Sequence, residues 1–395
     1  MSTLGQGEAE GSLVTPRDVS ELLGMRETSV LTVYLEVDPT KPENQRAMPA
    51  FGIWLKNALQ ALSADLPDEQ SSGFDGAVSR VSECVNYYPR AGKGLIVFAG
   101  EDLWKAFDLP LPVTNEIHWG RPHLPQLLWL LDEYEGYGVV LADSENARFF
   151  TVYLGTISER KEMVLSLDTS DWKQKDQVAP SFPEYERIGG SHRDAFEDRL
   201  DEQIQRFLRE VVESIEGFLS SEDVEQLFLA GTDAVHELER LLSPQLREEI
   251  VPIVPMDTSA YEHEVLEKTW PLQRAAVEKE NLQLVRRVVE QAVGREAVVT
   301  GVQPTLTSLQ QGRLQLLIAS REISAEVREC LECGFCSSDL FSKCPVCNSS
   351  DVHNASLTTL LPYLCRKYST KMKILSAGLA GQLNPQGGIG GVRRF

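Results

Sequence analysis

Five of the seven cysteines lie within 18 residues near the C-terminus, and four of them have the spacing of a metal site. Cys330 and Cys333 are separated by two residues, as are Cys344 and Cys347, and ten residues lie between the pairs. Two thiolates at this spacing can point at one ion, and four soft ligands in a tetrahedron suit zinc and leave no position for water. The pattern predicts a structural zinc ribbon over residues 328–354.

Two nearby residues leave the ligand set open. Cys336 is also separated from Cys333 by two residues, and His353 lies downstream, so either could replace a named cysteine. Reduced thiols on a turn and an iron–sulfur cluster are the other interpretations of the cluster. Clustered cysteines in a reducing compartment indicate metal binding rather than disulfides.

A second candidate is the glycine pair Gly189-Gly190, followed by Ser191, His192 and Arg193. It ends a long polar stretch, residues 173–192, and precedes a strongly amphipathic pattern typical of a helix. Loops of that length inside domains are usually functional or disordered. The simpler interpretation is a turn with Ser191 capping the helix. A catalytic Ser191/His192 pair is disfavoured, because adjacent residues rarely meet in the required geometry and no orienting carboxylate can be identified.

The third candidate is a basic group near the C-terminus, formed by Arg366, Lys367, Lys371 and Lys373. Residues 273–395 carry a net charge of +5, whereas residues 1–272 carry −26. The overall charge of −21 argues against non-specific coating of nucleic acid. The basic group is therefore either a solvated face or a local patch that contacts phosphates.

The strands and helices expected around these residues indicate an α/β protein of several domains. At 395 residues the chain suits two or three domains. No apolar run approaches the roughly 20 residues of a membrane span, and the N-terminus lacks the pattern of a secretory signal. We therefore expect a cytoplasmic protein that does not bind membranes, with a flexible leader over residues 1–17.

Periodicity predicts alternating strands and helices along the chain. We expect a hairpin from Tyr137 to Leu154 and a single long helix from Asp194. The other predicted strands are residues 29–37, 94–100, 224–230, 250–254, 296–301, 314–318 and 372–375. The other predicted helices are residues 49–62, 74–85, 124–134, 234–242, 261–272, 275–293, 303–311 and 359–368.

Several of these segments resemble, in the same order, the archaeal and eukaryotic class-I release factors and Pelota, in a divergent bacterial branch. The stretch YGVVLADSENARFFTVYLGTI resembles the opening hairpin of the family's central domain, and VEQLFLAGTDAVHELERLL resembles its following strand, turn and helix. EAVVTGVQPTLTSLQQGRLQLLIASREI resembles the third domain before its zinc ribbon, and GGIGGVRRF resembles the family's ending. The matches cover about 260 residues.

The resemblance implies three domains, each a mixed sheet with packed helices. They are an N-terminal α/β domain at 18–122, a central domain with the glycine loop at 123–272, and a C-terminal domain with the zinc-ribbon insertion at 273–395. The first domain does not resemble the codon-reading domain of release factors, and it lacks their Asn-Ile-Lys-Ser element. Stop-codon reading is therefore not expected.

The glycine loop bears on the chemistry that the resemblance implies. In the family a Gly-Gly-Gln enters the peptidyl-transferase centre and positions a water against peptidyl-tRNA. Here Gly189 and Gly190 match, but Ser191 replaces the glutamine, and positional errors of about 1 Å can cost about a hundredfold in rate. Catalysis is therefore the less favoured expectation, and we assign no catalytic residue.

Three functions remain open. The first is a non-catalytic factor in the A site of idle or stalled ribosomes, similar to Pelota and the bacterial hibernation factor Balon. It would be monomeric when free, contact rRNA, and partner elongation factor Tu or another translational GTPase. The second is a peptidyl-tRNA hydrolase for ribosome rescue. The third is a scaffold that binds RNA or protein away from the ribosome.

Overall fold

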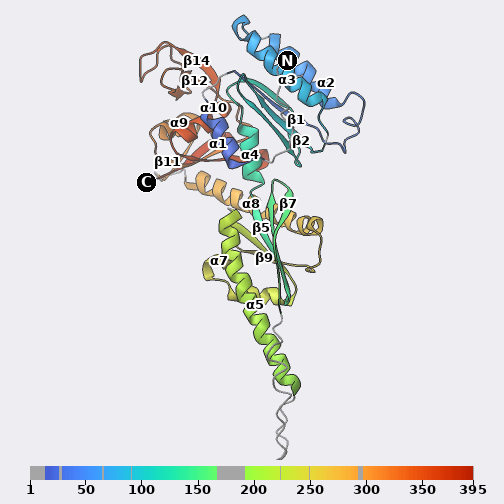
Figure 1. The fold of residues 1–395 in the computed structure, drawn as a ribbon. Helices are drawn as coiled ribbons and strands as arrows, with labels where there is room; N and C mark the ends of the chain where they lie inside the picture. The colour runs from blue at the N-terminus through green and yellow to red at the C-terminus, as the bar shows by residue number, and fades with distance from the viewer. Residues whose placement is uncertain are drawn as a thin grey trace, which may run out of the picture. The chain divides into compact units, whose positions relative to one another are not determined.

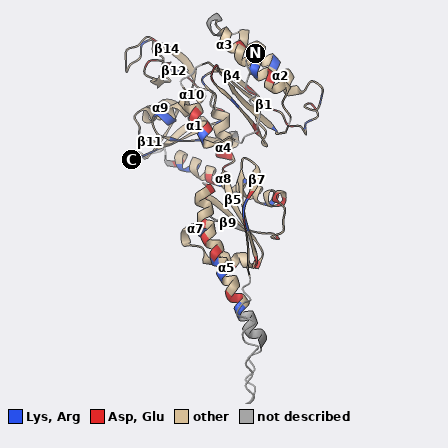
Figure 2. Ribbon diagram, viewed as in Figure 1, with Lys and Arg blue, Asp and Glu red and all other residues tan. Residues whose placement is uncertain are grey.

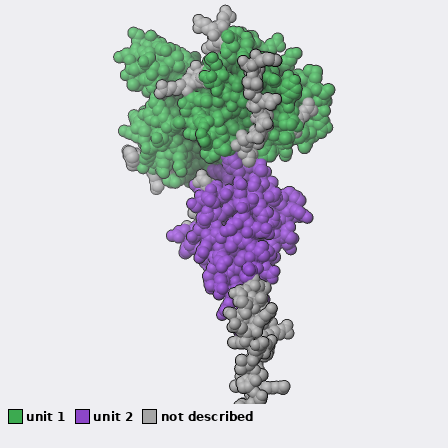
Figure 3. Space-filling model, in the orientation of Figure 1, with its two compact units in different colours: residues 1–134, 277–395 green, residues 135–276 purple. Residues whose placement is uncertain are grey.

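The computed structural model describes residues 14–25, 29–64, 66–89, 91–166, 192–222, 224–248, 250–291 and 297–394. They fall into two compact units (Figure 3), one of residues 1–134 with 277–395 and one of residues 135–276. The first unit therefore joins segments from the two ends of the chain. Among the described helices, none has the length and apolar character that crossing a membrane requires.

The N-terminal sheet of the first unit, in which Figure 1 labels β1 and β2, is antiparallel throughout. Its strand order is β3-β2-β1-β4. Odd-numbered residues of its central strand, including Leu31, Val33 and Leu35, pack with helices α2 and α3 in one apolar core. Burying one face of such a sheet against helices is what stabilises it. The elements are α1 (Pro16–Gly24), β1 (Val30–Glu36), α2 (Ala50–Ala64), α3 (Asp68–Asn86), β2 (Gly94–Ala99), β3 (Trp104–Leu109) and β4 (Glu116–Gly120).

The opposite face of β1 holds the segment that leads into helix α4 (Pro125–Glu133). The Tyr34 hydroxyl donates to the His123 carbonyl at 2.6 Å, and the His123 amide donates to Thr32 Oγ1 at 3.1 Å. Tyr34 and Thr32 lie on the same face because successive strand residues alternate between faces. Two hydrogen bonds thus fix the backbone of His123 against β1.

The C-terminal sheet is mixed, with order β10-β16-β11-β15. Helices α9 and α10 cover one face, and the end of α8 with α11 covers the other. At the edge strand β15 the Ile374 amide donates to Asp132 Oδ2 at 2.9 Å, which satisfies one exposed edge donor. The elements are β10 (Val298–Thr300), α9 (Val302–Gln310), β11 (Leu314–Ser320), α10 (Leu357–Lys367), β15 (Lys371–Leu375), α11 (Ala377–Ala380), a 3₁₀ turn η2 (Asn384–Gln386) and β16 (Ile389–Arg393).

A small antiparallel sheet of order β13-β12-β14 is inserted between β11 and α10. Its strands are β12 (Glu326–Cys330), β13 (Cys336–Ser337) and β14 (Val352–Ser356). Such a small sheet has little apolar core of its own, so another source of stability is needed. Cys330 is the last residue of β12, and Cys333, Cys344 and Cys347 lie in the turns that connect these strands.

The second unit is built on a mixed sheet of order β7-β6-β5-β8-β9. Helices α5 and α6 pack on one face, and the start of α8 packs on the other. The elements are β5 (Tyr137–Ala142), β6 (Asn146–Tyr153), β7 (Thr156–Val164), α5 (His192–Glu222), β8 (Gln226–Gly231), α6 (Asp233–Leu241), α7 (Pro244–Glu248), β9 (Ile250–Pro255) and α8 (Glu262–Gln291).

The α/β fold class is confirmed, and each of the three predicted domains contains its own sheet. The predicted domain boundaries remain a prediction, since the compact units group the segments differently. One local expectation is wrong: the predicted helices 261–272 and 275–293 are one continuous helix, α8, with Pro271 inside it. Proline removes one backbone hydrogen bond, and the apolar contacts on either side of it hold the helix together.

Candidate metal centre and flanking basic residues

Two matching turns position the four cysteines. Gly334 (φ 68°) and Asn348 (φ 60°) are left-handed, and each follows the second cysteine of its pair. The Gly334 amide donates to the Cys330 carbonyl at 2.8 Å, and the Asn348 amide donates to the Cys344 carbonyl at 2.9 Å. Glycine and asparagine adopt this conformation at low cost, so the residue types dictate the turns.

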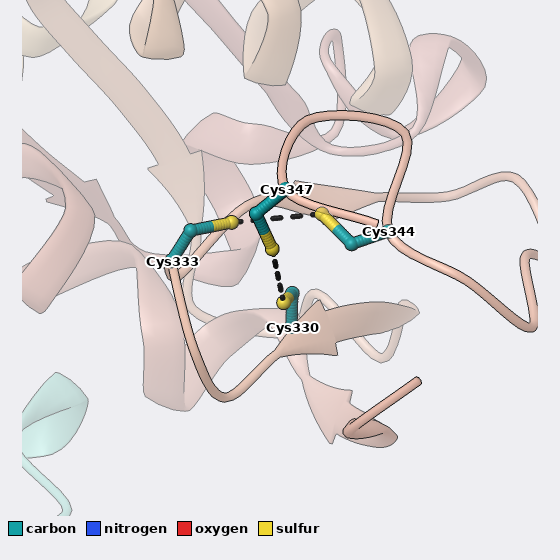
Figure 4. Close-up of side chains that lie close together, drawn as sticks. All are labelled: Cys330, Cys333, Cys344 and Cys347. Carbon is teal, nitrogen blue, oxygen red and sulfur yellow. Dashed lines mark hydrogen bonds between the residues drawn. The ribbon is translucent and has the colours of Figure 1, made fainter. Parts of the chain in front are cut away.

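The turns bring the four thiols together, as predicted (Figure 4). Cys330 Sγ lies 3.6 Å from Cys347 Sγ, and Cys333 Sγ lies 3.5 Å from Cys344 Sγ. A tetrahedral zinc with Zn–S bonds of about 2.3 Å separates its sulfurs by about 3.8 Å. The spacing therefore fits a four-thiolate zinc site, and all four cysteines are free of disulfides.

Backbone amides supply the polarity that thiolates require. Burial acts to raise the pKa of Cys344, but the amides of Cys347 and Val346, together with the Cys333 and Cys347 thiols, lower the pKa to about 7. Burial raises the pKa of Cys333 to about 12, and the neighbouring thiols add to this increase. Four adjacent thiolates need a cation to offset their repulsion, which is what a divalent metal supplies.

The two residues that left the ligand set open lie outside the cluster. Cys336 is buried in the core beneath α9 and α10, and its Sγ lies 3.7 Å from the Gly334 carbonyl. His353 Nε2 faces Glu329 Oε2 at 3.5 Å. The arrangement therefore favours Cys330, Cys333, Cys344 and Cys347 as the metal ligands.

The four predicted rRNA-contacting residues differ in their surroundings. Arg366 donates to the Ser20 carbonyl of α1, and Lys367 Nζ donates to the Cys333 carbonyl at 2.9 Å, so both make tertiary contacts within the first unit. Lys371 is exposed at the start of β15. The side chain of Lys373 is only 12% exposed and lies 3.9 Å from Glu280. Lys371 is therefore the basic residue of this set that is most available to a phosphate.

The predicted loop residues Gly189, Gly190 and Ser191 lie outside the described residues. His192 and Arg193 are the first residues of α5, two residues before the predicted start of this helix at Asp194. The described part of α5 carries both charge signs along its length (Figure 2). Its apolar residues, including Phe207, Val211 and Ile215, pack on the central sheet.

The structure also brings together three possible ligands that the sequence analysis missed: Glu116, His118 and His123. Glu116 and His118 are two residues apart on β4 and face the same side as Thr32 and Tyr34, their register partners on β1. His123 lies on that side because β1 fixes its backbone. The Glu-x-His spacing could have indicated two ligands on one face of a strand, but β4 was not predicted as a strand.

Comparison with known protein families finds a match for the central part of the chain. Residues 122–274 match the model of bacterial archaeo-eukaryotic release factor family 10. No curated protein matches the sequence.

Solved structures also match along much of the chain, with low identity and low overall superposition. The archaeal translation termination factor aRF1 is 14% identical, with 97% of this chain and 99% of that chain covered and a TM-score of 0.27. Archaeoglobus fulgidus Pelota is 16% identical, with 76% and 79% covered and a TM-score of 0.33. Dom34 of S. cerevisiae, described as a translation termination-like factor that interacts with Hbs1, is 9% identical, with 76% and 80% covered and a TM-score of 0.42.

Proposed function

We propose that this protein, whose residues 122–274 match a bacterial archaeo-eukaryotic release factor family, is a ribosome-associated factor. It would occupy the A site of idle or stalled ribosomes without cleaving peptidyl-tRNA. The observation that carries the proposal is the release factor domain at 122–274, with Ser191 in place of the glutamine that the family's Gly-Gly-Gln loop uses. It would act in the cytoplasm, in ribosome hibernation or rescue.

The first unit is one compact body, which a bound zinc would help to stabilise. Zinc held by Cys330, Cys333, Cys344 and Cys347 would be structural, since four thiolates leave no open position for chemistry. Lys367 contacts the cysteine turn and Arg366 contacts α1, so both contribute to the architecture of this unit. This leaves Lys371 as our candidate for contacting rRNA.

A peptidyl-tRNA hydrolase is the second candidate, because Gly189 and Gly190 are retained. A peptide-release assay on ribosomes carrying peptidyl-tRNA separates the two candidates. A non-catalytic factor gives no release above the uncatalysed rate, and Gly190→Ala changes nothing in that assay. Release by the wild-type protein that Gly190→Ala abolishes would establish the hydrolase instead.

Ribosome binding itself is tested by co-sedimentation with vacant 70S ribosomes over a salt series, with and without elongation factor Tu, our proposed GTPase partner. Binding that involves phosphates weakens as salt rises, because counterions are released on association. We expect saturable, salt-sensitive binding. An absence of binding at low salt under both conditions would contradict the proposal and favour a scaffold that works away from the ribosome.

A charge-reversal pair tests the rRNA contact. Lys371→Glu should weaken ribosome binding. It should also reduce the steepness of the plot of log binding constant against log salt concentration by about 1, as expected for one lost phosphate contact. Lys56→Glu is the matched control, because Lys56 is an exposed lysine on α2 in the acidic N-terminal segment. Equal effects of the two substitutions would show that only overall charge matters.

A further inference from the structure

Glu116, His118 and His123 place one carboxylate oxygen between two imidazole nitrogens. Glu116 Oε2 lies 3.8 Å from His118 Nε2 and 3.8 Å from His123 Nε2. These distances are too long for hydrogen bonds, which end near 3.2 Å. Two ligands of one tetrahedral ion, with bonds of about 2.1 Å, lie about 3.4 Å apart. The separations are close to those of a shared metal ion.

The three side chains have little else to bind. In the part of the chain that the structure describes, no hydrogen-bond donor reaches the Glu116 carboxylate or the Nε2 atom of either histidine. The His123 side chain is only 8% exposed, so water cannot readily satisfy its Nε2. Acceptors that face one another in a partly buried position are costly unless a cation or proton lies between them.

Surrounding residues orient two of the ligands. His123 Nδ1 lies 3.1 Å from Thr359 Oγ1 on α10, which can accept its proton and leave the Nε2 lone pair free. Metal-bound histidines almost always donate their other ring N–H in this way. Arg321 Nη2 lies 4.0 Å from Glu116 Oε1, which turns Oε2 toward the imidazoles.

We propose that Glu116, His118 and His123 form a second metal site, which binds a divalent transition-metal ion such as Zn²⁺ and is independent of the cysteine site. Two histidines and one glutamate form a ligand set that zinc accepts, with the fourth position open to water. Glu116 and His118 are 29% and 39% exposed, so an ion can enter from solvent.

One side chain must move when the ion binds. The two imidazoles are stacked, with centroids 3.5 Å apart and planes 15° apart. A metal ion lies in the plane of each ring that binds it, so two stacked rings cannot share one ion. His118 is the more exposed ring and rotates to direct its Nε2 at the ion, while His123 stays fixed by β1 and Thr359.

The test is Co²⁺ titration of the full-length protein whose cysteine site is already loaded with zinc. Cobalt bound by nitrogen and oxygen gives visible d–d bands without the thiolate charge-transfer band of a cysteine site. We expect one further equivalent with such a spectrum. His118→Asn and Glu116→Gln should each raise the Kd for this equivalent at least about tenfold.

Controls separate binding from folding. His236→Asn removes an exposed histidine on α6 and should leave the titration unchanged. Circular dichroism checks that the variants fold, and His118 is exposed enough that its loss should not unfold the sheet. The proposal is overturned if wild type takes up no further equivalent, if the added cobalt shows thiolate charge transfer, or if His118→Asn and Glu116→Gln bind as wild type does.

Discussion

The cysteine cluster and the Glu116–His118–His123 cluster both consist of side chains that can bind a metal ion, and both lie in the first compact unit. They are assembled differently. The cysteines come from two local turns, each closed by its own left-handed residue. The second cluster needs a strand alternation, the pairing of β4 with β1, and a third segment fixed across the sheet. A locally encoded site can be found from spacing, whereas a site built by tertiary structure cannot.

The two groups also differ in what the bound ion would do. Four thiolates close the coordination sphere and make the ion part of the fold of a small sheet. Three ligands on a sheet that already has a large apolar core leave the fold independent of the ion. We therefore expect metal removal to unfold the ribbon and to spare the N-terminal sheet.

The largest effect should follow from removing one thiolate. Cys344→Ser should abolish tight zinc binding at the ribbon and unfold β12 to β14, because structural zinc contributes about 10–16 kcal/mol of apparent binding free energy in small zinc domains. Zinc content and hydrogen exchange of the ribbon amides report this. Cys84→Ser, in α3, is the control, and unchanged zinc affinity in Cys344→Ser would contradict the assignment.

An intermediate effect, on stability, is expected from the ion pair that joins the segment after β4 to strand β12 of the ribbon. Arg121 Nη1, just after β4, lies 2.8 Å from Glu329 Oε1 on β12, and the Glu329 side chain is only 6% exposed. Arg121→Ala leaves this buried carboxylate with only the His353 imidazole beside it. It should therefore lower the free energy of unfolding of the first unit by about 3 kcal/mol.

Urea unfolding measures the Arg121 effect. Adding Glu329→Gln to Arg121→Ala should recover part of the loss, because the unpaired charge is then gone. Arg46→Ala, at an exposed arginine, is the control. A loss that the double variant does not relieve would mean that the contact matters through packing and not through charge.

The smallest effect should come from the hydrogen bond that orients His123. Thr359→Val keeps the shape of the side chain but removes the acceptor for Nδ1, so Co²⁺ affinity at the second cluster should fall about tenfold. Affinity at the cysteine site should not change. Equal affinity in Thr359→Val and wild type would show that Thr359 does not position this ligand.

The sequence predicted the elements whose apolar pattern is strong. Strands such as β1 and β2 and helices such as α2 and α10 appear within a few residues of their predicted bounds. The cysteine ligands were also predictable, since two short turns contain the whole site. The local sequence pattern was sufficient to predict these elements and the cysteine turns, because local interactions determine their structure.

Elements that depend on tertiary packing were missed. β4 is short and partly polar, and only its pairing with β1 makes it a strand. The final strand β16 contains Gly390 and Gly391, where an added Cβ would lie 3.0 Å from the Val299 carbonyl oxygen and 2.9 Å from the Leu316 carbonyl oxygen, respectively. Close approach of neighbouring backbone, and not turn formation, explains these glycines.

A competition experiment measures whether the protein occupies the ribosomal A site. Labelled protein bound to vacant 70S ribosomes would be titrated with a tRNA directed to the A site, and the bound fraction measured. We predict complete, saturable displacement by A-site tRNA and little displacement by a tRNA confined to the P site. Binding that is unaffected by A-site tRNA would contradict the account.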